Sequence, residues 1–248
     1  MTYDVITRAH RTTRRRITAL CLATAAVLGA AAVAMAFGAD SDRPASSTLG
    51  PVLVRPETTA NGQAVLPRDL DWVDVAGVSV PVSRQSGPRV SGEGQARGFT
   101  HDLGGAVLAA VHIVVRVNPQ VGPAVFESAL RTQIVGADAA AMRVQIRQAY
   151  DELRGQTGVA DGQPLGRLTA TLLGYRIVNY TQDEVVLRLL TEAPDGSGRS
   201  LMVSTEVRMR WTGSDWALLA PAGGTFDQAV TVVLDPYTAM FLPFNAGG

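Results

Sequence analysis

The stretch LMVSTEVRMRWTGSDWALL, residues 201–219, decides the fold class of this chain. Its first half alternates between an apolar set and a more polar set, namely Leu201, Val203, Thr205, Val207, Met209 and Trp211 against Met202, Ser204, Glu206, Arg208 and Arg210. Strict alternation predicts a β-strand with one buried and one wetter face. The turn residues at 212–215 lead into Trp216-Ala217-Leu218-Leu219, so we predict a second strand that returns beside the first.

Two further strands are predicted upstream of this stretch. Residues 168–181 and 183–192 are rich in strand-forming residues, and the sequence PDGSG at 194–198 provides a turn before the long strand. The four segments predict an antiparallel meander. Because one face of the long strand is apolar, we expect helices to cover that face of the sheet.

Three helices are predicted before the meander. The first covers 102–117 and can be capped by Thr100 or Asp102; its apolar stripe consists of Leu103, Val107, Ala110, Val114 and Val117. The second begins at Pro123 and ends at Gly136, and the third begins near Asp138 and ends at Gly155. Helices followed by an antiparallel meander define an α+β fold.

The residues ahead of the first helix predict shorter elements. Residues 69–83, DLDWVDVAGVSVPVS, fit one or two short strands, with Pro81 marking an edge. Gly87-Pro88 and Gly92-Glu93-Gly94 predict loops.

A membrane anchor is predicted near the N-terminus. From Ile17 to Gly38 there are 22 residues without a charge, enough to cross a hydrocarbon core that takes about 20 helical residues. Arg14, Arg15 and Arg16 precede this run, and the positive-inside rule keeps them in the cytoplasm. We therefore expect a single-pass protein of the inner (cytoplasmic) membrane. The competing interpretation is a signal peptide that is cleaved after the A-x-A sequence at 34–36.

The anchor divides the chain into four parts. Residues 1–16 form a basic cytoplasmic tail, 17–38 a transmembrane helix, 39–68 a flexible Pro-containing linker, and 69–248 an extracytoplasmic α+β domain. Beyond residue 38 there are 17 Arg against 21 acidic residues. Such a mildly acidic body is unsuited to nucleic acid, so the expected partners are the lipid bilayer and other proteins.

No catalytic, cofactor-binding or metal site is predicted. The chain has three His and one Cys, Cys21, and it contains no H-E-x-x-H, G-x-S-x-G or P-loop motif. Five residues would be the candidates if the domain enclosed a catalytic cavity: Asp102, His112, Tyr150, Tyr175 and Asp183. We expect Asp102 to cap the first helix instead of orienting His101, and His112 to be a hydrogen-bonded polar group beside the core.

The C-terminal residues 223–248 are unusually apolar for a segment that follows a completed meander. They contain Val230, Val232, Val233, Leu234 and the sequence FLPF at 241–244. Two roles are open: the segment covers the core at the end of the sheet, or it forms an exposed docking strip.

Several motifs carry a resemblance to a known family. They are Trp72, Pro81-Val82-Ser83, Gly87-Pro88, and Gly98-Phe99-Thr100-His101 leading into the apolar helix at 105–110. With helices preceding a meander that ends in W-T-G-S-D-W-A-L, the chain resembles actinobacterial membrane proteins of conjugative elements. These are similar to the TcpC-type and VirB8-type scaffold components of type IV secretion systems.

This resemblance implies a cone-shaped nuclear transport factor 2-like domain, with three helices packed on a curved antiparallel sheet. It also implies a scaffold or assembly role through protein–protein contacts, with homo-oligomers possible. TcpC-type proteins commonly carry two such domains, whereas 248 residues have room for one. The alternative from another class is an exported enzyme or small-ligand-binding protein that uses the cone cavity.

Overall fold

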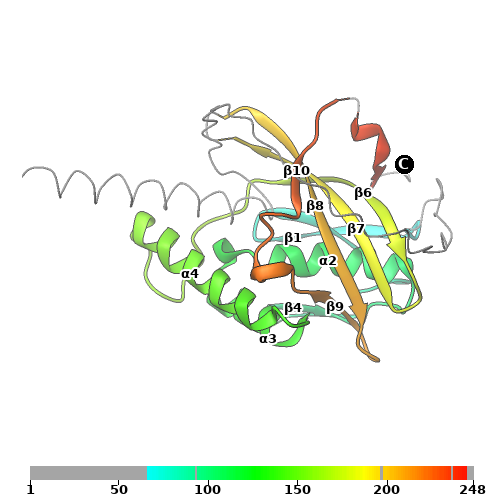
Figure 1. The fold of residues 1–248 in the computed structure, drawn as a ribbon, viewed down its shortest axis with the longest axis horizontal. Coiled ribbons are helices and arrows are strands. Elements are labelled where there is room, and N and C mark those ends of the chain that lie inside the picture. The colour runs from blue at the N-terminus through cyan, green and yellow to red at the C-terminus, as the bar shows by residue number, and fades with distance from the viewer. Residues whose placement is uncertain (1–65, 93, 196–197, 236, 245–248) are drawn as a thin grey trace, which may run out of the picture.

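The computed structural model describes residues 66–92, 94–195, 198–235 and 237–244. These residues form an α+β domain, as predicted, with three α-helices and a curved sheet (Figure 1). The helices are α2 (Leu103–Arg116), α3 (Pro123–Thr132) and α4 (Ala139–Thr157). The strands are β1 (Leu70–Val75), β2 (Val78–Ser83), β3 (Val90–Gly92), β4 (Gln95–Arg97), β5 (Ile134–Val135), β6 (Thr171–Tyr180), β7 (Glu184–Pro194), β8 (Ser200–Trp211), β9 (Trp216–Leu219), β10 (Val230–Val232) and β11 (Leu242–Pro243).

The main sheet contains the predicted meander. Its strand order is β11-β6-β7-β8-β9-β5, with β10 beside β8. The strands β6, β7, β8 and β9 pair antiparallel in sequence order, which confirms the predicted four segments. β5 adds a parallel edge to β9, and β10 and β11 add short antiparallel strands that the sequence did not predict.

The buried face of this sheet is covered by α2. Val207 and Met209 on β8 are buried together with Leu187 and Leu189 on β7, and α2 contacts β7, β8 and β9. The helix is also covered on its other side, because it packs against β2 and β4. Every residue from Gly104 to Arg116 is therefore buried. The sequence predicted only one apolar stripe here, but a helix that is apolar all round belongs in the interior.

The predicted helix starts are confirmed, whereas two predicted ends are wrong. Asp102 caps α2 by accepting a hydrogen bond from the Gly105 amide at 2.7 Å, and α3 begins at Pro123. α3 ends at Thr132, four residues before the predicted Gly136, because Ile134 and Val135 pair with β9 as β5. α4 continues through the predicted Gly155 to Thr157, and Gly158, with a φ of 71°, is its C-cap. α3 packs against both α2 and α4.

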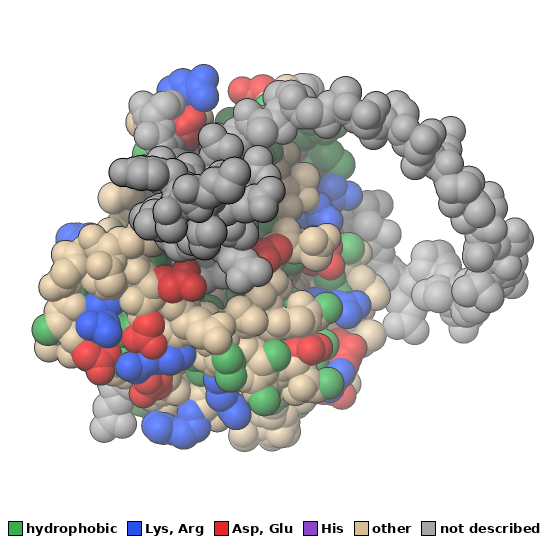
Figure 2. Space-filling view, turned by 60° about the vertical axis from the view of Figure 1, so that its left-hand side comes forward, with side chains coloured by type: hydrophobic (Ala, Val, Ile, Leu, Met, Phe, Trp, Pro, Cys, Tyr) green, Lys and Arg blue, Asp and Glu red, His purple; other side chains and the backbone are tan. Residues whose placement is uncertain are grey.

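The exposed face of α4 carries a network of ion pairs. Arg147 contacts Asp151, four residues further along the helix, at 3.3 Å, and also Glu127 at 2.9 Å and Asp161 at 3.0 Å. Figure 2, which turns the α4 side of the molecule forward, shows basic and acidic side chains interleaved on this face. The network joins α3, α4 and the loop after α4, and its exposed pairs contribute little individually.

The segment before α2 forms two hairpins. β1 pairs with β2, and Pro81 lies opposite Trp72, which confirms short strands at 69–83. β3 pairs with β4, so the glycines at 92 and 94 belong to a hairpin instead of the predicted plain loop. Gly94 has a φ of 74°, a value that glycine adopts at no steric cost.

No helix in the described part of the chain is long and apolar enough to cross a membrane. The predicted span from Ile17 to Gly38, the arginine triplet and linker residues 39–65 lie outside the described residues. Leu66, at the end of the predicted linker, is partly buried and packs against the core.

Candidate functional site

The five residues considered for a catalytic cavity are spread over α2, α4, β6 and the β6–β7 turn, and they have structural partners. Asp102 is the N-cap of α2, and His112 lies in the middle of this helix. Tyr150 lies on α4, Tyr175 on β6 and Asp183 in the β6–β7 turn. The Tyr150 hydroxyl donates to the Gln163 carbonyl at 2.9 Å, and the Tyr175 ring packs on Phe244 at 5.1 Å. The structure thus assigns these side chains to packing and hydrogen bonding.

His101 pairs with Asp183, a partner that lies 82 positions away in the sequence. Its Nε2 lies 2.9 Å from the Asp183 carboxylate, and its ring stacks on Trp211 with centroids 4.1 Å apart and an interplanar angle of 9°. Trp216 packs edge-on against both rings. The neighbouring Asp102 serves as the helix cap, so the expectation that it does not orient His101 is confirmed.

Asp215 joins this aromatic cluster to the loop that enters α2. Its carboxylate accepts hydrogen bonds from the amides of Gly98 at 2.7 Å, Phe99 at 3.2 Å and Trp216 at 2.9 Å. The Trp216 indole donates in turn to the Thr100 carbonyl at 2.9 Å. The two motifs G-F-T-H and W-T-G-S-D-W, which are far apart in the sequence, therefore meet in space. Neither motif alone indicated the other as its partner.

Replacing Asp215 by alanine is expected to lower the free energy of unfolding by about 1–3 kcal/mol, because it leaves part-buried amides without an acceptor. Urea unfolding of the full chain in detergent micelles, followed by circular dichroism, measures this change. Asp235→Ala is the matched control, since Asp235 is exposed and, within the described residues, its carboxylate accepts a hydrogen bond from the Thr238 hydroxyl. Equal losses in both variants would contradict the structural role of Asp215.

A buried His–Arg pair lies inside α2. Arg116 donates from Nη1 to Nδ1 of His112 at 2.9 Å and to the His112 carbonyl at 3.1 Å. His112 then donates from Nε2 to the Pro81 carbonyl at 2.9 Å, so the ring is neutral and both nitrogens are satisfied. This confirms the expectation of a hydrogen-bonded His112, although the ring lies within the core and not beside it.

The electrostatics of this pair follow from burial. Burial, together with the nearby guanidinium, lowers the pKa of His112 to about 3. Burial also lowers the pKa of Arg116 to about 10. Arg116 is 5% exposed and has no ion-pair partner among the described residues. Arg116 was not among the residues predicted for a site, although an Arg four positions after a His in an apolar helix was a visible signal.

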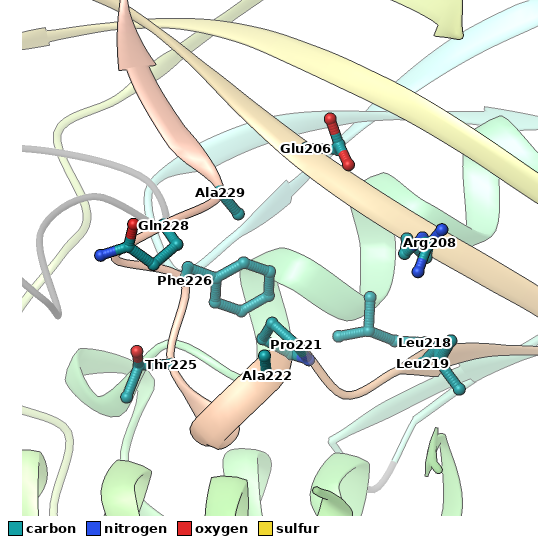
Figure 3. A pocket seen from close by; sticks show the side chains of 10 residues that line it. All are labelled: Glu206, Arg208, Leu218, Leu219, Pro221, Ala222, Thr225, Phe226, Gln228 and Ala229. Atoms are coloured by element: carbon teal, nitrogen blue, oxygen red, sulfur yellow. The ribbon is translucent and has the colours of Figure 1, made fainter. Parts of the chain in front are cut away.

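A pocket lies on the edge of β8 along which the neighbouring strand changes from β10 to β9. β10 pairs with residues 203–205 and β9 with residues 209–211, and the connection at 220–229 closes the space between them. The space measures about 170 Å³. Its apolar lining consists of Leu218, Leu219, Pro221, Ala222, Phe226 and Ala229. Figure 3 shows the Phe226 ring beneath β8, which carries Glu206 and Arg208.

The charged side chains of the pocket are not equivalent. Glu206 binds Arg188 of β7 at 3.1 Å. Arg210, the next arginine on this face of β8, binds Glu184 at 2.7 Å. Arg208 is exposed and has no ion pair within the described residues. The pocket therefore combines an apolar floor with one available guanidinium.

Part of the C-terminal segment covers the core, the first of the two roles that the sequence left open, and another part is exposed. Phe226 and Phe244 are 3% exposed and belong to the core. β10 and β11 attach the segment to β8 and to β6. Along the same segment four apolar side chains are between 45% and 67% exposed: Val232, Leu234, Tyr237 and Met240. We call these four residues the C-terminal strip.

The fold and these surfaces define a class of protein: an α+β domain with a helix-filled sheet face, a small pocket beside β8 and an exposed apolar strip. A family model described as "Domain of unknown function (DUF8175)" matches residues 30–239, and the chain belongs to this family. No curated protein and no solved structure matches the chain.

Proposed function

We propose that this protein is a membrane-anchored scaffold or assembly component of a conjugation-type (type IV) secretion machine. In this proposal Ile17–Gly38 spans the inner membrane, Arg14, Arg15 and Arg16 stay in the cytoplasm, and the α+β domain works outside. The domain is of the nuclear transport factor 2-like kind and acts through protein–protein contacts, including contacts between its own copies.

One observation carries the proposal: an uncharged run of 22 residues behind an arginine triplet precedes a folded domain with exposed apolar surface. The run and the triplet support a single span with the domain outside. The C-terminal strip supports a protein partner, because exposed apolar patches commonly mark interfaces.

The alternative, a small-ligand-binding protein or enzyme that uses the sheet face, has less support. The cavity that this alternative requires would lie on the face of the sheet that α2 covers, where α2 packs on β7, β8 and β9. The pocket beside β8 measures about 170 Å³, whereas small-molecule pockets typically measure about 300–1,000 Å³. The five polar candidates for a cavity site are also engaged in capping, packing and hydrogen bonding.

Reporter fusions after residue 244 test the topology. Alkaline phosphatase, which is active only after export, is expected to be active in this position, and green fluorescent protein is expected to be dark. Leu28→Arg places a charge in the apolar run at a cost of about 3 kcal/mol and is expected to reduce export. An active cytoplasmic reporter on the unaltered chain would contradict the proposed function.

The assembly role needs a second measurement. The full chain, crosslinked in its own membranes and purified, is expected to yield discrete complexes that contain a conjugation-type secretion ATPase. A chain that is exported but remains monomeric under these conditions would contradict the scaffold role while leaving the topology intact.

A further inference from the structure

We propose that the pocket beside β8 is a docking site for one aliphatic side chain that is followed by a carboxylate in a segment of a partner protein. This inference rests on the proposed function, since it names the chemistry of one protein contact of the assembly. The pocket is separate from the C-terminal strip, because the residues that line it lie between positions 206 and 229.

The size and lining of the pocket favour a single apolar side chain. A volume of about 170 Å³ lies below the roughly 300–1,000 Å³ of pockets that hold a whole small-molecule ligand. Leu218 and Phe226 are buried, and Ala222 and Ala229 add short side chains that leave space above them. An apolar group that enters this space removes apolar surface from water on both sides of the contact.

The charges around the pocket favour a carboxylate beside that side chain. Arg188 is engaged by Glu206 at 3.1 Å and Arg210 by Glu184 at 2.7 Å, whereas Arg208 between them has no ion pair in the described part of the chain. A guanidinium binds a carboxylate through two parallel N–H···O bonds. Arg208 therefore supplies an anion-binding group next to the apolar lining of the pocket.

The topology explains why the pocket suits a protein segment. The connection at 220–229 leaves the sheet between β9 and β10, so the space is a shallow notch at the sheet surface and opens to solvent. An extended segment can place one side chain in such a notch while its backbone remains outside. Arginine is also one of the residue types that are enriched in interface hot spots.

Peptide titrations of the full chain in detergent micelles test this inference. The methyl resonances of Leu218, Ala222 and Ala229 report on the pocket in two-dimensional NMR spectra. N-acetyl-Gly-Leu-Asp-Gly-amide is expected to shift all three, and the Asn analogue of this peptide is expected to bind about tenfold more weakly, because it lacks the charge that Arg208 binds.

Three variants separate the contributions. Arg208→Gln is expected to abolish the preference for the Asp peptide over the Asn peptide. Arg210→Gln is the matched control and is expected to retain the preference, since Arg210 is already paired with Glu184. Ala229→Leu fills the notch and is expected to abolish binding of both peptides; Ala222→Leu replaces it if that variant does not fold.

Two outcomes would overturn the inference. One is the absence of methyl shifts at 10 mM peptide, a limit that corresponds to about 2.7 kcal/mol of binding free energy. The other is equal or tighter binding of free 4-methylpentanoate, which would make the site one for a small acid. Either outcome leaves the exported topology and the crosslinked complexes unaffected, so failure here is distinguishable from failure of the proposed function.

Discussion

Gly105→Ala is expected to lower the free energy of unfolding by about 2–3 kcal/mol or more, the cost of overpacking a tight contact. A Cβ at position 105 would lie 2.1 Å from the Thr100 carbonyl oxygen and 2.8 Å from the Thr100 amide nitrogen. The Thr100 backbone has little freedom to move, because its carbonyl accepts the hydrogen bond from the Trp216 indole at 2.9 Å. The close approach of α2 to the preceding loop thus requires glycine.

This prediction is sharp because local helix propensity predicts the opposite sign. Alanine is about 1 kcal/mol more favourable than glycine inside an isolated helix. Gly155→Ala in α4 is the matched control, since nothing lies within 4 Å of its added Cβ, and it is expected to stabilise the protein by roughly 0.5–1 kcal/mol. Chemical unfolding of both full-length variants measures the difference, and stabilisation by Gly105→Ala would show that the α2 contact is wrong.

The stability of the domain is expected to fall as the pH is lowered from 6.5 toward 3, because of His112. Its pKa is about 3 in the folded protein and 6.5 in the unfolded chain. Between these values the unfolded chain binds the additional proton, so stability is fully present above pH 6.5 and declines below it. The limiting slope for one such group is about 1.4 kcal/mol per pH unit.

His112→Gln tests the assignment. A glutamine amide can donate toward the Pro81 carbonyl and accept from Arg116, as the neutral ring does at 2.9 Å in each case, but it does not titrate. Unfolding midpoints measured between pH 4 and pH 7.5 are expected to decline less steeply in this variant than in the unaltered protein. His101→Gln, a change to a His whose side chain is 30% exposed, serves as the control and is expected to retain most of the decline. Equal pH dependence in His112→Gln and the unaltered protein would refute a neutral buried His112.

The prediction from the sequence was most accurate where the pattern was long and local. The strand pattern at 201–211 and the turn at 212–215 predicted β8 and β9 nearly residue by residue. Asp102 and Pro123 predicted the starts of α2 and α3, because caps depend on residues within one turn. The end of α4 was predicted at Gly155, whereas Gly158 is the glycine that caps it in the left-handed conformation. The two faces of β8 and the α+β order also followed from the sequence alone.

The tertiary structure decided what depends on contacts between distant segments. β5 and β11 have two residues each, too few to carry a period, and they exist because β9 and β6 offer free edges. The pairing of His101 with Asp183 and the meeting of Asp215 with Gly98 join positions more than 80 apart.

The same distinction holds for the pocket and for the anchor. The alternation along β8 placed Arg208 on the wetter face, but only the change of neighbour from β10 to β9 sets its guanidinium beside an apolar notch. The expected membrane span, in contrast, follows from one uncharged run and its flanking arginines, because transfer of a helix into lipid depends on local composition. Local composition and periodicity are present in the chain before it folds, whereas the pocket comes into existence only when β8, β9 and residues 220–229 pack together.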